Sequence, residues 1–154
     1  MATPTAGATA EAVIVKRTFA APREKVFEAW TNPQLMARWF CRCAKHPPTR
    51  VIQTDVRPGG QYRLEVQGDK LYRGSGTYQE VRPPEKLVFT WNWEHDDFAN
   101  TVVTVEFRSL GASGFTEVTL THELLPTEKA RAEHRQGWND CFDMLERTLR
   151  GEEF

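Results

Sequence analysis

The sequence lacks any long hydrophobic run and any excess of charge of one sign. No stretch approaches the roughly 20 apolar residues of a membrane span, and residues 1–11 contain neither the basic nor the apolar region of a signal peptide. Lys and Arg total 20 against 21 Asp and Glu, so the chain offers no basic field for a nucleic-acid backbone. These absences predict a cytoplasmic protein with no membrane span and no nucleic acid as partner.

Cysteine is scarce, and the familiar catalytic motifs are missing. The 3 cysteines, Cys41, Cys43 and Cys141, are odd in number, which indicates reduced thiols. There is no Gly-rich phosphate loop, no Gly-x-Ser-x-Gly and no His-Glu-x-x-His pattern. Cys41-x-Cys43-x-x-His46 lacks the second ligand pair of a structural zinc site, and residues 95–97 (His-Asp-Asp) suit a solvated turn. We therefore expect no metal and no cofactor.

The length of 154 residues, with 40% hydrophobic residues, fits one compact domain. Residues 1–11 are rich in Ala and Thr and are expected to form a flexible tail. Residues 12–150 are then a single folded domain, and residues 151–154 are its C-terminal end.

The domain is predicted to begin with a strand and two short helices. β-branched and charged residues favour a strand over Val13–Phe19, and Pro22 suits the first turn of a helix. Asn32-Pro33 breaks this helix before a second one that carries Trp39. Residues 41–50 show little periodicity and are expected to be a loop.

Residues 51–123 are predicted to form strands separated by turns rich in Gly, Pro and Asp. Apolar residues alternate within these strands, so that one face is buried. No helical period intervenes, so neighbouring strands should pair antiparallel. The residues expected to share inner faces are Tyr62, Leu64 and Val66; Leu87, Phe89, Trp91 and Trp93; Val103, Val105 and Phe107; and Val118, Leu120 and His122.

A long helix is predicted over residues 126–150, because Trp138, Cys141, Phe142 and Leu145 recur at helical spacing. Gly137 weakens this helix by about 1 kcal/mol, and we expect close approach of the helix to the sheet to be its reason. About seven strands make a sheet about 29 Å wide, whereas the helix covers a strip only about 10 Å wide. We therefore predict an α+β fold in which the sheet curls around the helix.

The inward-facing side chains of this arrangement have two interpretations. They either pack against one another or line a pocket for an apolar or aromatic small molecule. The predicted cavity residues are Phe27, Trp30, Trp39, Tyr62, Leu64, Phe89, Trp91, Trp93, Val105, Phe107, Leu120, His122, His134, Trp138, Cys141, Phe142 and Leu145. His122 and His134 are also weak candidates for an acid–base role, against the alternative of hydrogen-bonded structural histidines.

Several blocks in order resemble the heat shock protein 90 ATPase activator homologue domains of the START-like (SRPBCC) superfamily. The resemblance covers about residues 12–150. The blocks are Ala21-Pro22-Arg23-Glu24-Lys25-Val26-Phe27-Glu28-Ala29-Trp30-Thr31-Asn32-Pro33, Asp55-Val56-Arg57-Pro58-Gly59-Gly60, Gly76-Thr77-Tyr78, Pro83-Pro84-Glu85-Lys86-Leu87-Val88-Phe89-Thr90-Trp91, Val102-Val103-Thr104-Val105, Thr119-Leu120-Thr121-His122-Glu123 and His134-Arg135-Gln136-Gly137-Trp138.

This resemblance implies the helix-grip fold (START-like/Bet v-like), a curved antiparallel sheet gripping a long C-terminal helix over a hydrophobic cavity. It does not fix an activity, because superfamily members bind lipids, hormones or antibiotics, assist a chaperone, or act as enzymes. The leading hypothesis is a binding module for a hydrophobic small molecule. The alternatives are a protein-interaction role in stress response or chaperone ATPase activation, and a cyclase- or hydrolase-like enzyme that uses a cavity histidine.

Overall fold

The computed structural model describes residues 11–42 and 47–152. The predicted flexible tail therefore lies outside the described residues apart from Glu11. So do Cys43 and His46 of the metal-like spacing, and residues 153–154 of the predicted C-terminal end.

The strands form a 7-stranded antiparallel sheet in the order β1-β7-β6-β5-β4-β3-β2. Consecutive strands from β2 to β7 are neighbours, and β1 joins the sheet beside β7. This confirms the predicted antiparallel pairing. The strands are β1 (Val13–Phe19), β2 (Arg50–Thr54), β3 (Gln61–Gln67), β4 (Leu71–Arg82), β5 (Lys86–Trp93), β6 (Thr101–Ser109) and β7 (Thr116–Glu123).

The helices are α2 (Arg23–Thr31), α3 (Pro33–Trp39) and α4 (Glu128–Leu149), with a short 3-10 turn at Gly111–Ser113. Asn32 ends α2 and also begins α3, because its side chain accepts hydrogen bonds from the backbone of the first turn of α3. The Thr127 hydroxyl caps α4 by accepting from the Ala130 N–H at 3.0 Å. None of the helices in the described segments is long and apolar enough to cross a membrane.

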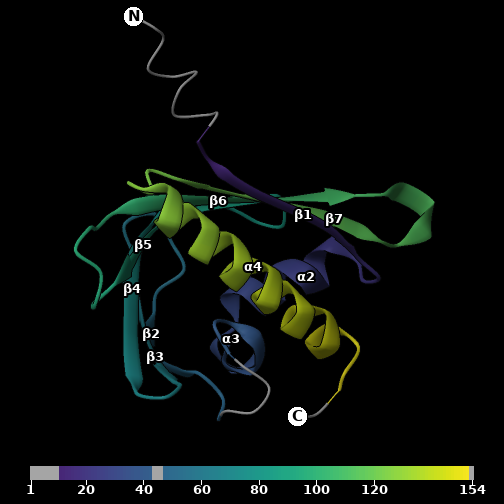
Figure 1. Ribbon diagram of the computed structural model, residues 1–154. Coiled ribbons are helices and arrows are strands. Elements are labelled where there is room, and N and C mark those ends of the chain that lie inside the picture. Colours follow the sequence, from purple (N-terminus) through teal and green to yellow (C-terminus); the bar gives the residue numbers. More distant parts are fainter. Residues whose placement is uncertain (1–10, 43–46, 153–154) are drawn as a thin grey trace, which may run out of the picture.

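The sheet bends around α4, as Figure 1 shows: β1, β7 and β6 pass over the helix, and β4, β3 and β2 turn down beside it. The pairing register shifts in β2 between Val51 and Gln53 and in β4 between Tyr78 and Glu80. Such irregularities increase local bending of a sheet. The helices α2 and α3 lie within the curve next to α4. The predicted curled sheet is confirmed.

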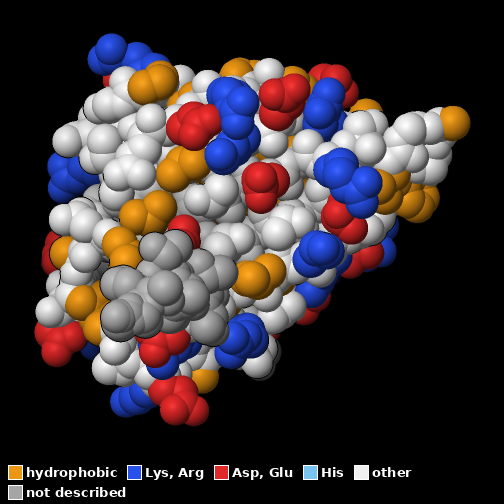
Figure 2. Space-filling view, turned by 90° about the horizontal axis from the view of Figure 1, so that it is seen from above, with side chains coloured by type: hydrophobic (Ala, Val, Ile, Leu, Met, Phe, Trp, Pro, Cys, Tyr) orange, Lys and Arg blue, Asp and Glu red, His pale blue; other side chains and the backbone are white. Residues whose placement is uncertain are grey.

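The outer face of the sheet is polar. Figure 2 looks down on the part formed by β1, β7 and β6 and shows Lys and Arg side chains interspersed with Asp and Glu, with some hydrophobic side chains between them. The strands alternate accordingly, and β7 is buried at every second residue from Thr116 to His122. One face of the sheet is therefore left for the core.

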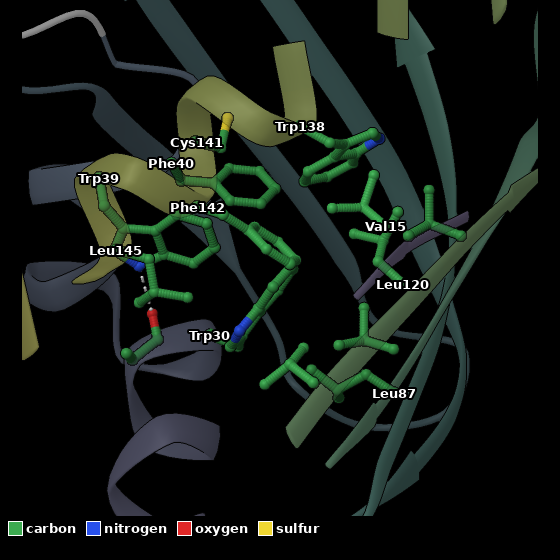
Figure 3. Packing of buried hydrophobic residues seen from close by; sticks show 14 of the residues in the cluster. Val15, Trp30, Trp39, Phe40, Leu87, Leu120, Trp138, Cys141, Phe142 and Leu145 are labelled. Atoms are coloured by element: carbon green, nitrogen blue, oxygen red, sulfur yellow. Dashed lines mark hydrogen bonds between the residues drawn. The ribbon is translucent and has the colours of Figure 1, made fainter. Parts of the chain in front are cut away.

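The space between the sheet and α4 is largely filled by aromatic rings from α2 and α3. The ring of Trp30 lies 4.7 Å from Trp39 and 6.1 Å from both Trp138 and Phe142, centroid to centroid (Figure 3). The Trp39 indole also donates to the Ala29 carbonyl at 2.9 Å. A void of about 10 Å³ lies between Trp30, Met36, Phe40, Tyr62, Tyr78 and Phe89.

Gly76 shows how closely β4 meets its neighbours. A Cβ at Gly76 would lie 1.9 Å from the Thr90 carbonyl oxygen and 2.5 Å from the Tyr62 hydroxyl. At Gly74 a Cβ would lie 3.1 Å from the Trp91 ring. The space above both glycines is therefore taken by the protein's own backbone and aromatic rings.

Candidate functional site

A cavity of about 590 Å³ lies along α4, beside the packed core. We call it the α4 groove. Its floor is buried, with Trp91 and Trp138 3% and 4% exposed, whereas Glu133 and Asp140 at its rim are exposed. The groove therefore opens to the surface. Its lining residues are Cys41 and Arg42 after α3; Trp91, Trp93, His95 and Asp96 from β5 and the following turn; and Glu133, His134, Gly137, Trp138, Asp140, Cys141, Asp143, Met144 and Arg147 from α4.

Helical spacing divides most of the α4 residues of the groove into two rows. His134, Trp138 and Cys141 form an inner row, four and three residues apart, next to the core. A second row on the same side, the outer row, continues at steps of four and three residues and consists of Glu133, Gly137, Asp140, Met144 and Arg147. Residues three and four apart share one side of a helix, so each row forms a continuous edge of the groove.

The floor of the groove is aromatic. The rings of Trp91 and Trp93 meet edge to face at a centroid distance of 4.9 Å, and Trp91 lies 6.3 Å from Trp138. Trp93 is only half-buried and lies 5.5 Å from the exposed His95 ring. The rings of Trp138, Trp91 and Trp93 thus run from the core toward the surface. They form a continuous aromatic wall along the floor of the groove, and this wall suits aromatic or apolar groups.

His122 lies behind this wall in a fully satisfied hydrogen-bond chain. The Trp138 indole N–H donates to His122 Nδ1 at 3.0 Å, so the neutral ring carries its proton on Nε2. That nitrogen donates to the Thr101 hydroxyl at 2.8 Å, and Thr101 donates to the Trp91 carbonyl at 2.9 Å. The chain connects α4 to β5, β6 and β7 behind the groove floor.

Burial, with a smaller contribution from neighbouring His134, lowers the pKa of His122 from 6.5 to about 3. The side chain is 0% exposed and is absent from the groove lining. Both nitrogens are occupied, and protonation of Nδ1 would leave the Trp138 N–H without its acceptor. This geometry favours the structural interpretation of His122 over the acid–base one.

His134 does line the groove, but its hydrogen bonding is incomplete. Nδ1 donates to the Ala130 carbonyl, one turn earlier, at 2.7 Å. Nε2 is buried and has no hydrogen-bond partner among the described residues. Its ring meets His122 edge to face at 5.1 Å and Phe98 at 6.3 Å. No carboxylate hydrogen-bonds to the His134 ring, so an orienting partner for acid–base catalysis is not provided by the described residues.

Two free thiols, those of Cys41 and Cys141, line the groove together. Cys41 has a φ of 58°, a left-handed conformation, and its backbone N–H points to Cys141 Sγ at 3.3 Å. The side-chain hydrogen bond with Cys141 raises the pKa of the Cys41 thiol well above its usual value, and burial raises it further. A raised pKa disfavours the nucleophilic thiolate form of Cys41 at neutral pH.

The end of the groove near the C-terminus of α4 carries arginines. Arg42 is 8% exposed and donates to the Arg38 carbonyl at 3.3 Å, while Arg147 pairs with Glu152 at 3.0 Å. Burial lowers the pKa of Arg42, and the charges of Arg38 and Arg147 lower it further. Three arginine side chains, those of Arg38, Arg42 and Arg147, are thus close enough at this end to influence one another.

The structure divides the predicted cavity residues between three places. Trp91, Trp93, His134, Trp138 and Cys141 line the α4 groove. Trp30, Tyr62 and Phe89 border the small void. The rest line neither space and are buried in the packed interior: Phe27, Trp39, Leu64, Val105, Phe107, Leu120, His122, Phe142 and Leu145.

Sequence reasoning missed the outer row of α4 and the positions contributed by loops. The outer row had a usable signal, because Glu133, Gly137, Asp140 and Met144 each lie one residue before or three after an inner-row position, and Arg147 continues the same spacing three residues after Met144. Cys41, Arg42, His95 and Asp96 had none, since only the folded chain brings the loop after α3 and the β5–β6 turn to α4.

The predicted reason for Gly137 is wrong. A Cβ placed there would meet no atom within 4 Å, so close packing of the helix on the sheet does not require glycine. The residue is exposed and lines the groove instead. Its missing side chain widens the groove.

The described residues contain no group of three or more His, Cys, Asp or Glu side chains arranged to hold a metal ion. His95 and Asp96 belong to the turn after β5, and His95 Nε2 lies 3.7 Å from Asp96 Oδ1.

Solved structures share this fold. CV1439 from Chromobacterium violaceum is 22% identical, with a TM-score of 0.80 over 92% of this chain and 99% of that protein. CalU16 from Micromonospora echinospora is 25% identical, with a TM-score of 0.69 over 90% and 75% of the two chains. DynU16, from the dynemicin biosynthetic locus, is 23% identical, with a TM-score of 0.74 over 91% of this chain and 47% of that one.

No curated protein matches the sequence. The sequence pattern of the family described as "Activator of Hsp90 ATPase homolog 1-like protein" does match, over residues 20–150. That span contains α2, α3, α4 and every strand after β1, and it includes all the residues that line the α4 groove. The chain therefore belongs to the Activator of Hsp90 ATPase homolog 1-like family, with the helix-grip fold of the START-like proteins.

Proposed function

We propose that this protein binds an apolar or aromatic small molecule in the α4 groove. The observation that carries the proposal is the groove itself, a space of about 590 Å³ with Trp91, Trp93 and Trp138 in its walls. Its volume falls in the range of small-molecule sites, which are concave and mostly apolar with a few polar groups. We further propose a cytoplasmic location, because the described thiols are free.

The alternatives receive less support. A protein-docking role calls for a contiguous apolar patch, whereas the exposed large hydrophobic residues come from separate strands and turns: Ile14, Ile52, Leu71, Phe115 and Leu124. An acid–base role for His122 would require a ring nitrogen that is available to a substrate. Both ring nitrogens of His122 already form hydrogen bonds, with Trp138 and Thr101. Binding without a chemical step is the simplest function for these residues.

The test is a ligand screen with a wall variant and a matched control. An apolar and aromatic library is titrated against the protein while the melting temperature and tryptophan fluorescence are followed. A ligand that binds the folded state raises the melting temperature. Trp93→Leu should weaken the hits by about tenfold or more, since an aromatic wall is lost. Phe115→Leu removes an exposed ring outside the groove and should leave binding unchanged. A library without a single hit, or hits indifferent to Trp93→Leu, would refute the proposal.

A further inference from the structure

The outer row of α4 has a gap at its centre. Gly137 lies between Glu133 and Asp140 in this row, and a Cβ there would meet no protein atom within 4 Å. Glycine weakens a helix interior, and here no protein contact offsets that loss. Protein packing therefore does not account for glycine at this position.

No cationic side chain of the described residues forms an ion pair with the carboxylates on either side of this gap. Within residues 11–42 and 47–152, neither Glu133 nor Asp140 takes part in an ion pair, and Asp140 accepts only from the Gln136 amide, at 3.0 Å. By contrast, Asp143 in the same groove is paired with Arg17 at 2.7 Å. The two carboxylates beside the gap are thus exposed and outside the ion pairs of the described residues.

A third carboxylate of the groove, that of Asp96, belongs to the turn after β5. Its Oδ1 lies 3.7 Å from His95 Nε2. The lining arginines lie at the other end, since Arg147 is ten residues, or about 15 Å, along the helix from Gly137. Arg147 is also engaged with Glu152 at 3.0 Å. Glu133 and Asp140 therefore flank Gly137, whereas the lining arginines lie near the end of α4.

We propose that the groove selects an aromatic ligand bearing a protonated amine. The ammonium group would lie over Gly137 between Glu133 and Asp140, and the aromatic body against Trp93 and Trp138. Carboxylates supply the attraction for the cation, and tryptophan faces stabilise both ammonium groups and aromatic rings. This inference rests on the proposed function and adds the charge of the ligand and its position on α4.

The experiment uses three probes with one ring system: naphthylmethylamine, naphthylmethanol and naphthoate, which are cationic, neutral and anionic at pH 7. Calorimetric titration of the full chain should give affinities in that order, with the amine about tenfold tighter than the alcohol at low salt. Added salt should weaken the amine and leave the alcohol unchanged.

The double variant Glu133→Gln/Asp140→Asn should reduce the affinity of the amine to that of the alcohol, which should itself bind as before. A matched control, Glu24→Gln/Glu28→Gln on α2, changes the net charge equally at exposed positions outside the groove and should have no effect. Gly137→Leu should weaken all three probes without lowering the melting temperature, because leucine favours a helix and would project into the groove.

Equal affinity for the three probes, tightest binding of naphthoate, or an amine affinity unchanged by Glu133→Gln/Asp140→Asn would overturn the charge selection while leaving small-molecule binding intact. Failure of all three probes, together with a library free of hits, would overturn the proposed function as well.

Discussion

The Trp138 indole donates a 3.0 Å hydrogen bond to His122 Nδ1 and thereby fixes the buried imidazole in its neutral, Nε2-protonated form. This bond joins the wall of the α4 groove to the sheet behind it. Thr101 continues the connection to the Trp91 carbonyl. The position of two groove tryptophans thus depends on a histidine that does not itself line the groove.

The stability of the protein should fall as the pH drops from about 6.5 toward 3, in part because of His122. Its pKa is lowered in the folded state from 6.5 to about 3, so in this window the unfolded chain binds a proton that the folded chain does not. The contribution is complete above pH 6.5 and declines below it, by at most about 1.4 kcal/mol per pH unit. Urea unfolding at pH 4.5, 5.5 and 7 would measure it. His122→Gln should show a shallower slope, and an unchanged slope would contradict the assignment.

Trp138→Phe should cost about 1–3 kcal/mol beyond the loss of ring volume, because His122 Nδ1 loses its donor inside the protein. The variant should also raise the pKa of His122, since Nδ1 becomes available for protonation. Trp30→Phe is the matched control, because Trp30 Nε1 is buried without a hydrogen-bond partner among the described residues. Denaturant unfolding of both variants measures the difference in their free energies of unfolding, which reports on the hydrogen bond between Trp138 and His122. Equal losses of stability in the two variants would show that this hydrogen bond does not stabilise the protein.

Alanine should have opposite effects at two glycines. Gly76→Ala places a Cβ 1.9 Å from the Thr90 carbonyl oxygen and should cost about 3 kcal/mol or more. Gly137→Ala meets open space in a helix and should stabilise the unliganded protein by up to about 1 kcal/mol. Thermal and urea unfolding measure both. A destabilised Gly137→Ala protein would mean that packing, after all, requires this glycine.

Cys41 should react slowly with iodoacetamide at pH 7–8, because hydrogen bonding to Cys141 and burial raise its pKa. The comparison is made in a Cys43→Ser background, with alkylation at each remaining thiol followed by mass spectrometry. Cys141→Ala removes the first cause and should accelerate labelling of Cys41 several-fold. Labelling as fast as that of an unfolded control would be incompatible with the raised pKa.

Local sequence patterns were sufficient for the elements and their order. Alternation such as Leu87, Phe89 and Trp91 identifies the buried face of a strand, because side-chain direction there depends only on position along the chain. Asn32-Pro33 marks a helix boundary because proline disfavours the helical conformation of the residue before it. In the structure α2 ends and α3 begins at this point. The same patterns placed Trp138 and Cys141 on one side of α4.

The sequence by itself therefore determined the antiparallel sheet, the long last helix and the identity of most buried residues, since these follow from periodicity. It could not apportion the buried rings between core and groove. That depended on how far α2 and α3 enter the curve of the sheet, where the rings of Trp30 and Phe40 lie 6.1 and 5.9 Å from the ring of Trp138 in the middle of α4. Only the tertiary structure decided that the remaining space lies beside α4 at Gly137, because the volume left empty depends on side chains brought together from distant parts of the chain.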